Sequence, residues 1–231
     1  MSDEKVLTKI IAEQFVQNTD AVQLNEFLHI ETDAADVLGS FEENWTLTLN
    51  GIRDLSVQQA AALSKHSGHL ELNGIFSPTD EVINELSQFV GRLFLGGITA
   101  LSSTASESLS SHVGTLYLSG LTKLTPDNAF WLSQHDGNLY FDSVGSISEV
   151  IAAHLSHHKG AIGLDGVTSI SDEVAKQLSN HRGVLGLIEL KQLSEQAAFH
   201  LLDYRGELSI WLEELPPSVA KILLQHDSVE D

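Results

Sequence analysis

Histidine recurs along the chain at a fixed interval of 23 residues, or a multiple of it. The members are His66, His112, His135, His158 and His181, with His226 in the equivalent place of a shorter last interval. Neutral imidazole nitrogens bind zinc and copper well, so a row of them could hold a metal. However, Phe89 and Tyr204 take the same place in two other intervals, which indicates a requirement for a planar ring. We therefore predict a structural role, in which the imidazole bonds the last carbonyl groups of a helix.

A second histidine pattern is local. His154 and His158 are four residues apart, a spacing that can chelate a metal ion on one helix. The stretch reads H-L-S-H-H, so it lacks the intervening glutamate of a zinc protease helix, and no third ligand is evident. We predict no metal site and no cofactor, and keep this pair as an alternative.

Serine also recurs at this interval, just before the histidine place. The row comprises Ser64, Ser87, Ser110, Ser133, Ser156 and Ser179. A nucleophilic serine needs an oriented base and oxyanion donors around it, and here every serine has the same neighbours as the others. Bonding back to helix carbonyls is the simpler role for such residues. We predict no catalytic residue and no enzymatic activity.

These rows are part of a repeat that is marked by glycine. Glycine stands every 23 residues at Gly68, Gly91, Gly114, Gly137, Gly160, Gly183 and Gly206, and Trp45 takes this place one interval earlier. We number repeat positions from this residue as position zero. A fixed period of this length is typical of a solenoid, whose units bury their apolar faces against one another.

Each repeat predicts a strand, a turn and a helix. Apolar residues at positions two and four lie on one face of a short strand, and those at positions fifteen and eighteen follow a helical spacing. Serine or threonine at position eleven is a typical helix N-cap. Because strand and helix alternate, the strands are expected to be parallel.

The strand pairs carry a resemblance to the leucine-rich repeat family. They are Leu47/Leu49, Leu70/Leu72, Leu93/Leu95, Leu116/Leu118, Leu139/Phe141, Ile162/Leu164, Leu185/Leu187 and Leu208/Ile210. The resemblance implies a right-handed α/β solenoid, a horseshoe with a parallel sheet on its concave face and short helices on its convex face. The chain resembles an atypical, bacterial kind, because the turn has Ile or Leu where the family has Asn or Cys. Glycine before that residue predicts a close backbone approach.

Repeat position three, on the outward face of the strand, breaks the pattern. Phe94, Tyr117 and Tyr140 follow one another there, where a core requires no aromatic residue. On a parallel sheet they would stand about 5 Å apart, as neighbouring exposed aromatics do at interaction sites. The polar residues around them are Arg92, Asp142, Asp165, Asn138 and Glu71. The alternative is that the rings only strengthen the strands.

We expect a single repeat domain over residues 1–231. Residues 1–44 would form an N-terminal cap, with a helix over 4–18, started by Ser2 or Asp3, and a degenerate first repeat whose strand holds Val22 and Leu24. Seven repeats over 45–205 and a C-terminal capping repeat over 206–231 complete it.

Composition limits the classes of partner. Thirty-two acidic residues against 12 basic ones give a net charge of −20, which opposes binding to nucleic acid or to anionic lipid and suits a basic partner. The chain has no cysteine, no signal-peptide pattern at its start and no membrane-spanning run, so we expect a cytoplasmic protein.

The sequence thus predicts a non-enzymatic module that recognises a protein or peptide through the concave sheet. The alternative is a small-ligand protein that binds a carbohydrate on the aromatic residues or a metal at the histidine pair. Nothing in the sequence indicates an oligomeric state.

Overall fold

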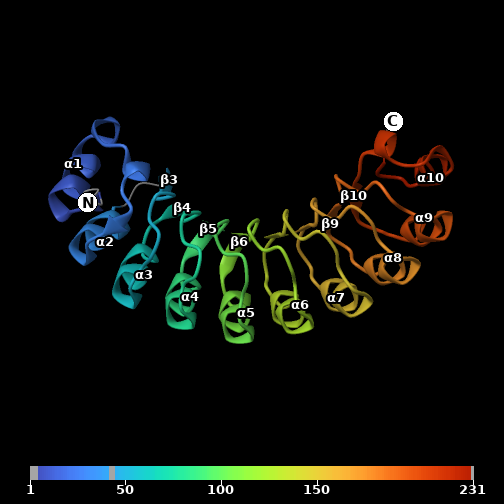
Figure 1. Cartoon of the computed structure of the whole chain (residues 1–231), viewed down its shortest axis with the longest axis horizontal. Helices are drawn as coiled ribbons and strands as arrows, with labels where there is room; N and C mark the ends of the chain where they lie inside the picture. Colours follow the sequence, from blue (N-terminus) through green and yellow to red (C-terminus); the bar gives the residue numbers. More distant parts are fainter. Residues whose placement is uncertain (1–4, 42–44, 230–231) are drawn as a thin grey trace. The chain divides into compact units, whose positions relative to one another are not determined.

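The computed structural model describes residues 5–41 and 45–229. These residues divide into two compact units, 1–117 and 118–231, which we describe separately. In each unit the strands lie along one side and the helices along the other (Figure 1). Within the described ranges, no helix combines the length and the apolar character that crossing a bilayer requires.

The first unit begins with elements outside the regular repeat and continues with strand–helix repeats. Its elements are β1 (Val6–Leu7), α1 (Lys9–Gln17), β2 (His29–Ile30), α2 (Thr32–Gly39), β3 (Trp45–Thr48), α3 (Val57–Leu63), β4 (Gly68–Glu71), α4 (Asp80–Leu86), β5 (Val90–Phe94), α5 (Ser103–Ser110) and β6 (Val113–Tyr117). Two 3₁₀ turns, Thr19–Ala21 and Leu24–Glu26, separate α1 from β2.

The second unit continues the same alternation. Its elements are α6 (Pro126–Leu132), β7 (Leu139–Tyr140), α7 (Glu149–Leu155), β8 (Ile162–Gly163), α8 (Asp172–Leu178), β9 (Val184–Gly186), α9 (Glu195–Leu202), β10 (Glu207–Ser209), a 3₁₀ turn (Leu212–Glu214) and α10 (Pro217–Leu223).

Every described strand pair is parallel and joins residues one period apart. In the first unit Leu47 pairs with Leu70, and Phe94 pairs with Tyr117. In the second unit Leu139 pairs with Ile162. The expectation of parallel strands alternating with helices is confirmed, and the 23-residue interval is the register of the pairing.

The leucines of repeat positions two and four form the core. Leu93, Leu95, Leu116 and Leu118 are fully buried, as are the helix residues at positions fifteen and eighteen. Because side chains alternate along a strand, burying these positions leaves positions one, three and five on the opposite side. The helices contribute one apolar face each and expose the other.

The predicted helix starts are confirmed. The hydroxyl oxygen at position eleven accepts the backbone N–H three residues on, at Ser56, Thr79, Ser102, Thr125, Ser148, Ser171 and Ser194. These helices are only seven or eight residues long, so packing between neighbouring helices has to stabilise them.

The N-terminal segment differs from the predicted helix over 4–18. Val6 and Leu7 form a strand that pairs with β2, and the helix begins at Lys9 after Thr8. Pairing buries Leu7 fully, whereas Ile10, in the first turn of the helix, is 66% exposed. The proposed caps Ser2 and Asp3 lie outside the described residues.

The degenerate first repeat is also only partly as expected. Val22 and Leu24 form no strand, because the chain there makes tight 3₁₀ turns. Ala35 and Leu38 are buried in α2 as predicted, and α1 packs on that helix. At the other end, α10 packs on α9, and the Ser228 hydroxyl accepts the backbone N–H of Leu208 on β10.

The turn glycines allow a close backbone approach, as predicted. A Cβ on Gly97 would lie 2.4 Å from the carbonyl oxygens of both Asn73 and Ile75, which belong to the preceding repeat. A contact this short requires the backbone to shift.

We therefore expect Gly97→Ala to lower the free energy of unfolding by about 1–3 kcal/mol, since an added methyl group is costly in a tightly packed site. Gly145→Ala is the control, because a Cβ there meets nothing within 4 Å. Urea unfolding of both variants measures the difference. Equal effects of the two substitutions would contradict the tight approach.

The histidine row is buried and stacked. In the second unit the rings of His135, His158, His181, Tyr204 and His226 follow one another at centroid distances of 5.9 to 6.3 Å. Burial, with a smaller contribution from the neighbouring His158, lowers the pKa of His135 to about 4. Burial also lowers the pKa of His158 and of His181.

These shifts predict acid sensitivity. A histidine whose pKa is lower in the folded state than its usual 6.5 binds more protons when the protein is unfolded. The protein therefore keeps its full free energy of unfolding above pH 6.5 and loses part of it as the pH drops towards 4. For His135 the lowered pKa corresponds to a loss of about 3 kcal/mol in the free energy of unfolding, once the pH is below the pKa of both the folded and the unfolded state. The nearby Asp136 acts in the opposite direction on His135.

We expect His158→Phe to reduce the loss of stability between pH 7 and pH 4.5. Phenylalanine already occupies this position as the fully buried Phe89, so the row accommodates a ring that cannot be protonated. Melting temperatures of wild type and variant across this pH range are the measurement. An unchanged pH dependence would show that other groups cause the acid sensitivity.

Candidate functional site

Two aromatic rings on the strand side of the first unit stack on each other. Phe94 lies on β5 between the buried Leu93 and Leu95, so its side chain points away from the core. Tyr117 lies opposite it on β6. The ring centroids are 4.1 Å apart and the planes differ by 5°, so the two rings stand side by side as expected.

Both stacked rings are half-buried, because each covers one face of the other. Stacking therefore leaves each ring its edge and at most one face for contact with a partner. Such an arrangement offers a partner a rigid apolar ridge, and rigid aromatic side chains lose little entropy on binding.

Polar residues flank this stack in the first unit. Arg92 lies at position one of the Phe94 repeat, pairs in register with His69 and Thr115, and is exposed. Glu71 is half-buried, and its carboxylate accepts a hydrogen bond of 2.9 Å from Asn50 Nδ2. Arg92 can thus contact a partner directly, whereas Glu71 is already held by its own chain.

Tyr140 lies on the strand side of the second unit. It is half-buried on β7 and pairs in register with Gly163 on β8. Its ring lies across Gly163, since a Cβ on that glycine would come within 2.6 Å of Tyr140 Cδ1. The expectation that three rings form one row stays a prediction for this third ring.

Two carboxylates follow the strands of this unit. Asp142 is exposed and accepts the Ser119 hydroxyl at 2.6 Å. Asp165 is half-buried, and its Oδ1 accepts the backbone N–H of Ile188 at 3.3 Å. Burial raises the pKa of Asp165, and the negative charges of Asp142 and Glu189 raise it further.

Asn138 has a structural partner. Its Oδ1 accepts the backbone N–H of Ala161 at 2.9 Å, at the start of the next strand. Asn138 therefore connects two repeats, which leaves its side-chain NH₂ group for any outside contact.

The structure also shows how the atypical turns are satisfied. A side-chain oxygen at position five accepts the backbone N–H of the next repeat: Asn25 from Asn50, Asn50 from Asn73, and Asn73 from Gly96, at 2.7 to 2.9 Å. Asp165 does the same for Ile188. The sequence analysis missed this role, although Asn50 and Asn73 are one repeat period apart and could have indicated it.

Asn73→Ala is expected to lower the free energy of unfolding by about 1–3 kcal/mol, because it leaves the Gly96 N–H without its acceptor. Asn73→Asp keeps an acceptor oxygen, as Asp165 does in the other unit, and is expected to cost clearly less. Chemical denaturation of both variants tests this. If the alanine variant is no less stable than the aspartate variant, the hydrogen bond has no stabilising role.

The serine row has the predicted structural role. The hydroxyl of each serine donates to the carbonyl oxygen three residues earlier, at 2.6 to 3.0 Å, for Ser64, Ser87, Ser110, Ser133, Ser156 and Ser179. The hydroxyl proton of each serine is donated to a carbonyl oxygen of the same helix end, so it does not face a side-chain base that could remove it.

The partners of the histidine rings differ from those expected. His66 Nε2 lies 3.2 Å from the carbonyl oxygen of Trp45, and His181 Nδ1 lies 3.0 Å from that of His158. Trp45 begins the repeat that contains His66, and His158 belongs to the repeat before that of His181, so neither carbonyl lies in the last turn of the same helix. The reason is that the ring lies beyond the helix end, where the chain turns into the next strand.

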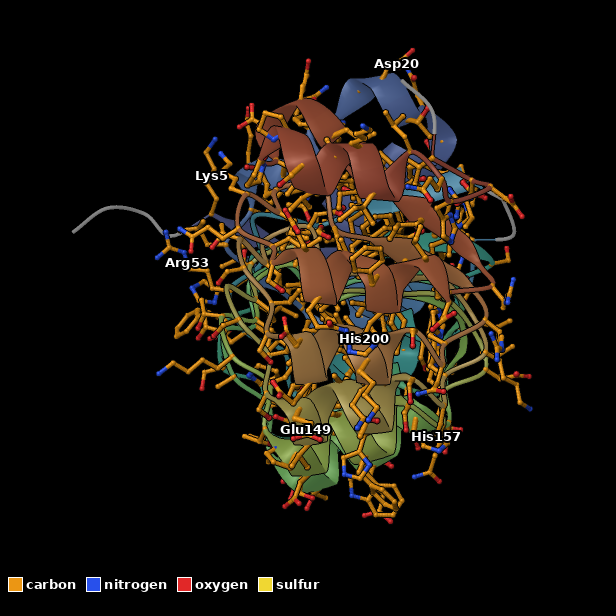
Figure 2. All side chains as sticks on the ribbon, turned by 90° about the vertical axis from the view of Figure 1, so that its right-hand side faces the viewer. Lys5, Asp20, Arg53, Glu149, His157 and His200 are labelled. Carbon is orange, nitrogen blue, oxygen red and sulfur yellow. The ribbon has the colours of Figure 1, made fainter. Side chains whose placement is uncertain are left out.

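The histidine pair of the alternative metal hypothesis is separated. His158 is 2% exposed and stacks between His135 and His181. His154 instead packs against the ring of Phe130, 5.6 Å away. Exposed His157 points outward from the ribbon (Figure 2). The described residues contain no group of three or more His, Cys, Asp or Glu that could hold a metal ion.

No family model and no curated protein sequence matches the chain. Among solved structures, an internalin from Listeria monocytogenes is similar over 96% of this chain and 74% of its own, at 14% identity and a TM-score of 0.48. A leucine-rich-repeat protein from Leptospira interrogans is similar over 87% of this chain and 63% of its own, at 13% identity and a TM-score of 0.40.

The fold itself is defined by the chain's own geometry. Parallel strands one period apart, buried apolar residues at positions two and four, and helices capped by a hydroxyl at position eleven occur in both units. The chain therefore has a leucine-rich-repeat-like fold.

Proposed function

We propose that this protein is a non-enzymatic recognition module that binds a protein or peptide segment through the strand side of its repeats. The stack of Phe94 and Tyr117 carries the proposal. It stands on the face that the core does not use, and it breaks a repeat that is otherwise closely kept. Rigid aromatic residues of this kind dominate the binding energy of many protein interfaces.

The ring geometry favours a protein partner over a sugar. The positively polarised C–H groups of a sugar pack on the negative face of an aromatic ring. Here the two rings lie 4.1 Å apart and nearly parallel, so each ring covers a face of the other. Ring edges suit contacts with apolar side chains and with backbone carbonyl oxygens.

The neighbouring polar residues would orient the partner. Arg92 is exposed beside the stack, and on the second unit Asp142 and Asp165 lie beside the Tyr140 strand. Glu71 and Asn138 would contribute through the donor and acceptor atoms that their own hydrogen bonds leave available. A cytoplasmic location and a basic partner remain predictions from composition.

The proposal is tested with Phe94→Ala and Tyr117→Ala combined. The variant is expected to fold, with a loss of about 0.5–1.5 kcal/mol for the stacked pair beyond its buried area, and to lose the partner that wild-type protein captures from native cells. Quantitative affinity capture and a thermal melt measure the two effects.

Phe76→Ala is the matched control, because Phe76 is in the same unit and 62% exposed but lies in a loop. Capture that survives the double substitution and fails with Phe76→Ala would place the binding surface on the loops instead.

A further inference from the structure

We infer that the strand side of the second unit, at Tyr140, Asp142 and Asp165, binds an arginine or lysine side chain of an extended basic segment in the partner. This inference rests on the proposed function and specifies the chemistry of the partner. It uses only residues of the second unit, so it is testable apart from the Phe94–Tyr117 stack.

The two carboxylates are held in place by their own chain. Asp142 accepts the Ser119 hydroxyl, and Asp165 accepts the Ile188 N–H. Each of these hydrogen bonds occupies one carboxylate oxygen, and a carboxylate can accept at several more lone-pair positions. A cation therefore meets preorganised acceptors and spends little entropy in ordering them.

No described basic residue neutralises either carboxylate. Among the described residues, the ion pairs of this unit join Lys191 to Glu189 and to Glu214, and none includes Asp142 or Asp165. Asp165 is half-buried beside two other acids, and their charges and its burial both make its ionised form costly. A cation placed here removes that cost.

Two paired glycines bring the ring and the carboxylates together. Gly163 and Gly186 stand opposite each other at repeat position three of β8 and β9, and both are buried. Tyr140 covers the first of them and the Asp165 carboxylate covers the second, each within 2.7 Å of where a Cβ would be, and Asp142 Oδ1 lies 3.5 Å from the Cβ position of Gly163. The aromatic ring and both carboxylates therefore lie around neighbouring glycines, so a basic side chain that reaches the carboxylates can lay its aliphatic stem against Tyr140.

The arrangement suits an organic cation better than a metal ion. The described acids and histidines nowhere form a group of three that could coordinate one. An arginine side chain needs only two carboxylate oxygens and gains from an aromatic neighbour. The net charge of −20 also attracts a basic segment from a distance.

The test uses a short fluorescent peptide of alternating arginine and serine, titrated with full-length protein and followed by fluorescence anisotropy. Asp142→Asn combined with Asp165→Asn is expected to weaken binding about tenfold. Asparagine keeps an oxygen acceptor for Ser119 and for Ile188, as Asn73 does for Gly96, so the variant is expected to fold.

Glu173→Gln combined with Glu195→Gln is the control. Both residues are exposed on helices of the same unit, so the net charge changes equally and binding is expected to change less than about twofold. The same peptide with citrulline in place of arginine is expected not to bind wild-type protein.

Equal weakening by the two variant pairs would reduce the interaction to general charge attraction and overturn the inference. Binding of the citrulline peptide, or no binding of the arginine peptide at low salt, would also overturn it. If the native partner requires Phe94 and Tyr117 but tolerates the aspartate substitutions, the recognition function stands and this inference alone fails. If the Phe94/Tyr117 variant and the Asp142/Asp165 variant both lose the native partner, the result supports both the recognition function and this inference.

Discussion

Parallel pairing of each strand with the same segment of the next repeat is the constraint on which the structure depends. Leu93 pairs with Leu116, and Leu139 with Ile162, so equivalent side chains stack on one another within each unit. No repeat buries its leucines alone. The turn must then let two backbones approach closely, which glycine at position six allows at Gly97 and a side-chain acceptor at position five stabilises at Asn73.

Because the repeats stack in register, the residues at each repeat position form a row. The residues of one row have similar surroundings, so they have the same structural role. Hydroxyls at position eleven cap helices, and planar rings at position twenty-one fill the space beyond the helix ends. Chemistry that needs different groups to converge is hard to build from such rows. Function is therefore expected where a row changes its residue type on the side that the core leaves open.

The strand side meets this condition in both units, in different ways. In the first unit position three changes from Thr48 and Glu71 to two stacked rings. In the second unit the same position changes from Tyr140 to glycine, while position five carries aspartate. The first unit thus offers a partner hydrophobic contact, and the second unit offers charge complementarity to a basic segment.

Periodicity in the sequence was enough to predict the repeat, its strand and helix halves, the N-caps and the outward position of Phe94 and Tyr117, because each depends on local spacing that recurs. It failed at the N-terminal end: Val6–Leu7 pairs with His29–Ile30 one period later, although the residues there do not follow the strand pattern of the other repeats. Only tertiary structure decided which backbone atoms the histidine rings meet, that Asn50 and Asn73 satisfy the turns, and that Asp165 lies over Gly186. These contacts join residues 21 to 23 positions apart in the chain, which become neighbours only after the strands have paired.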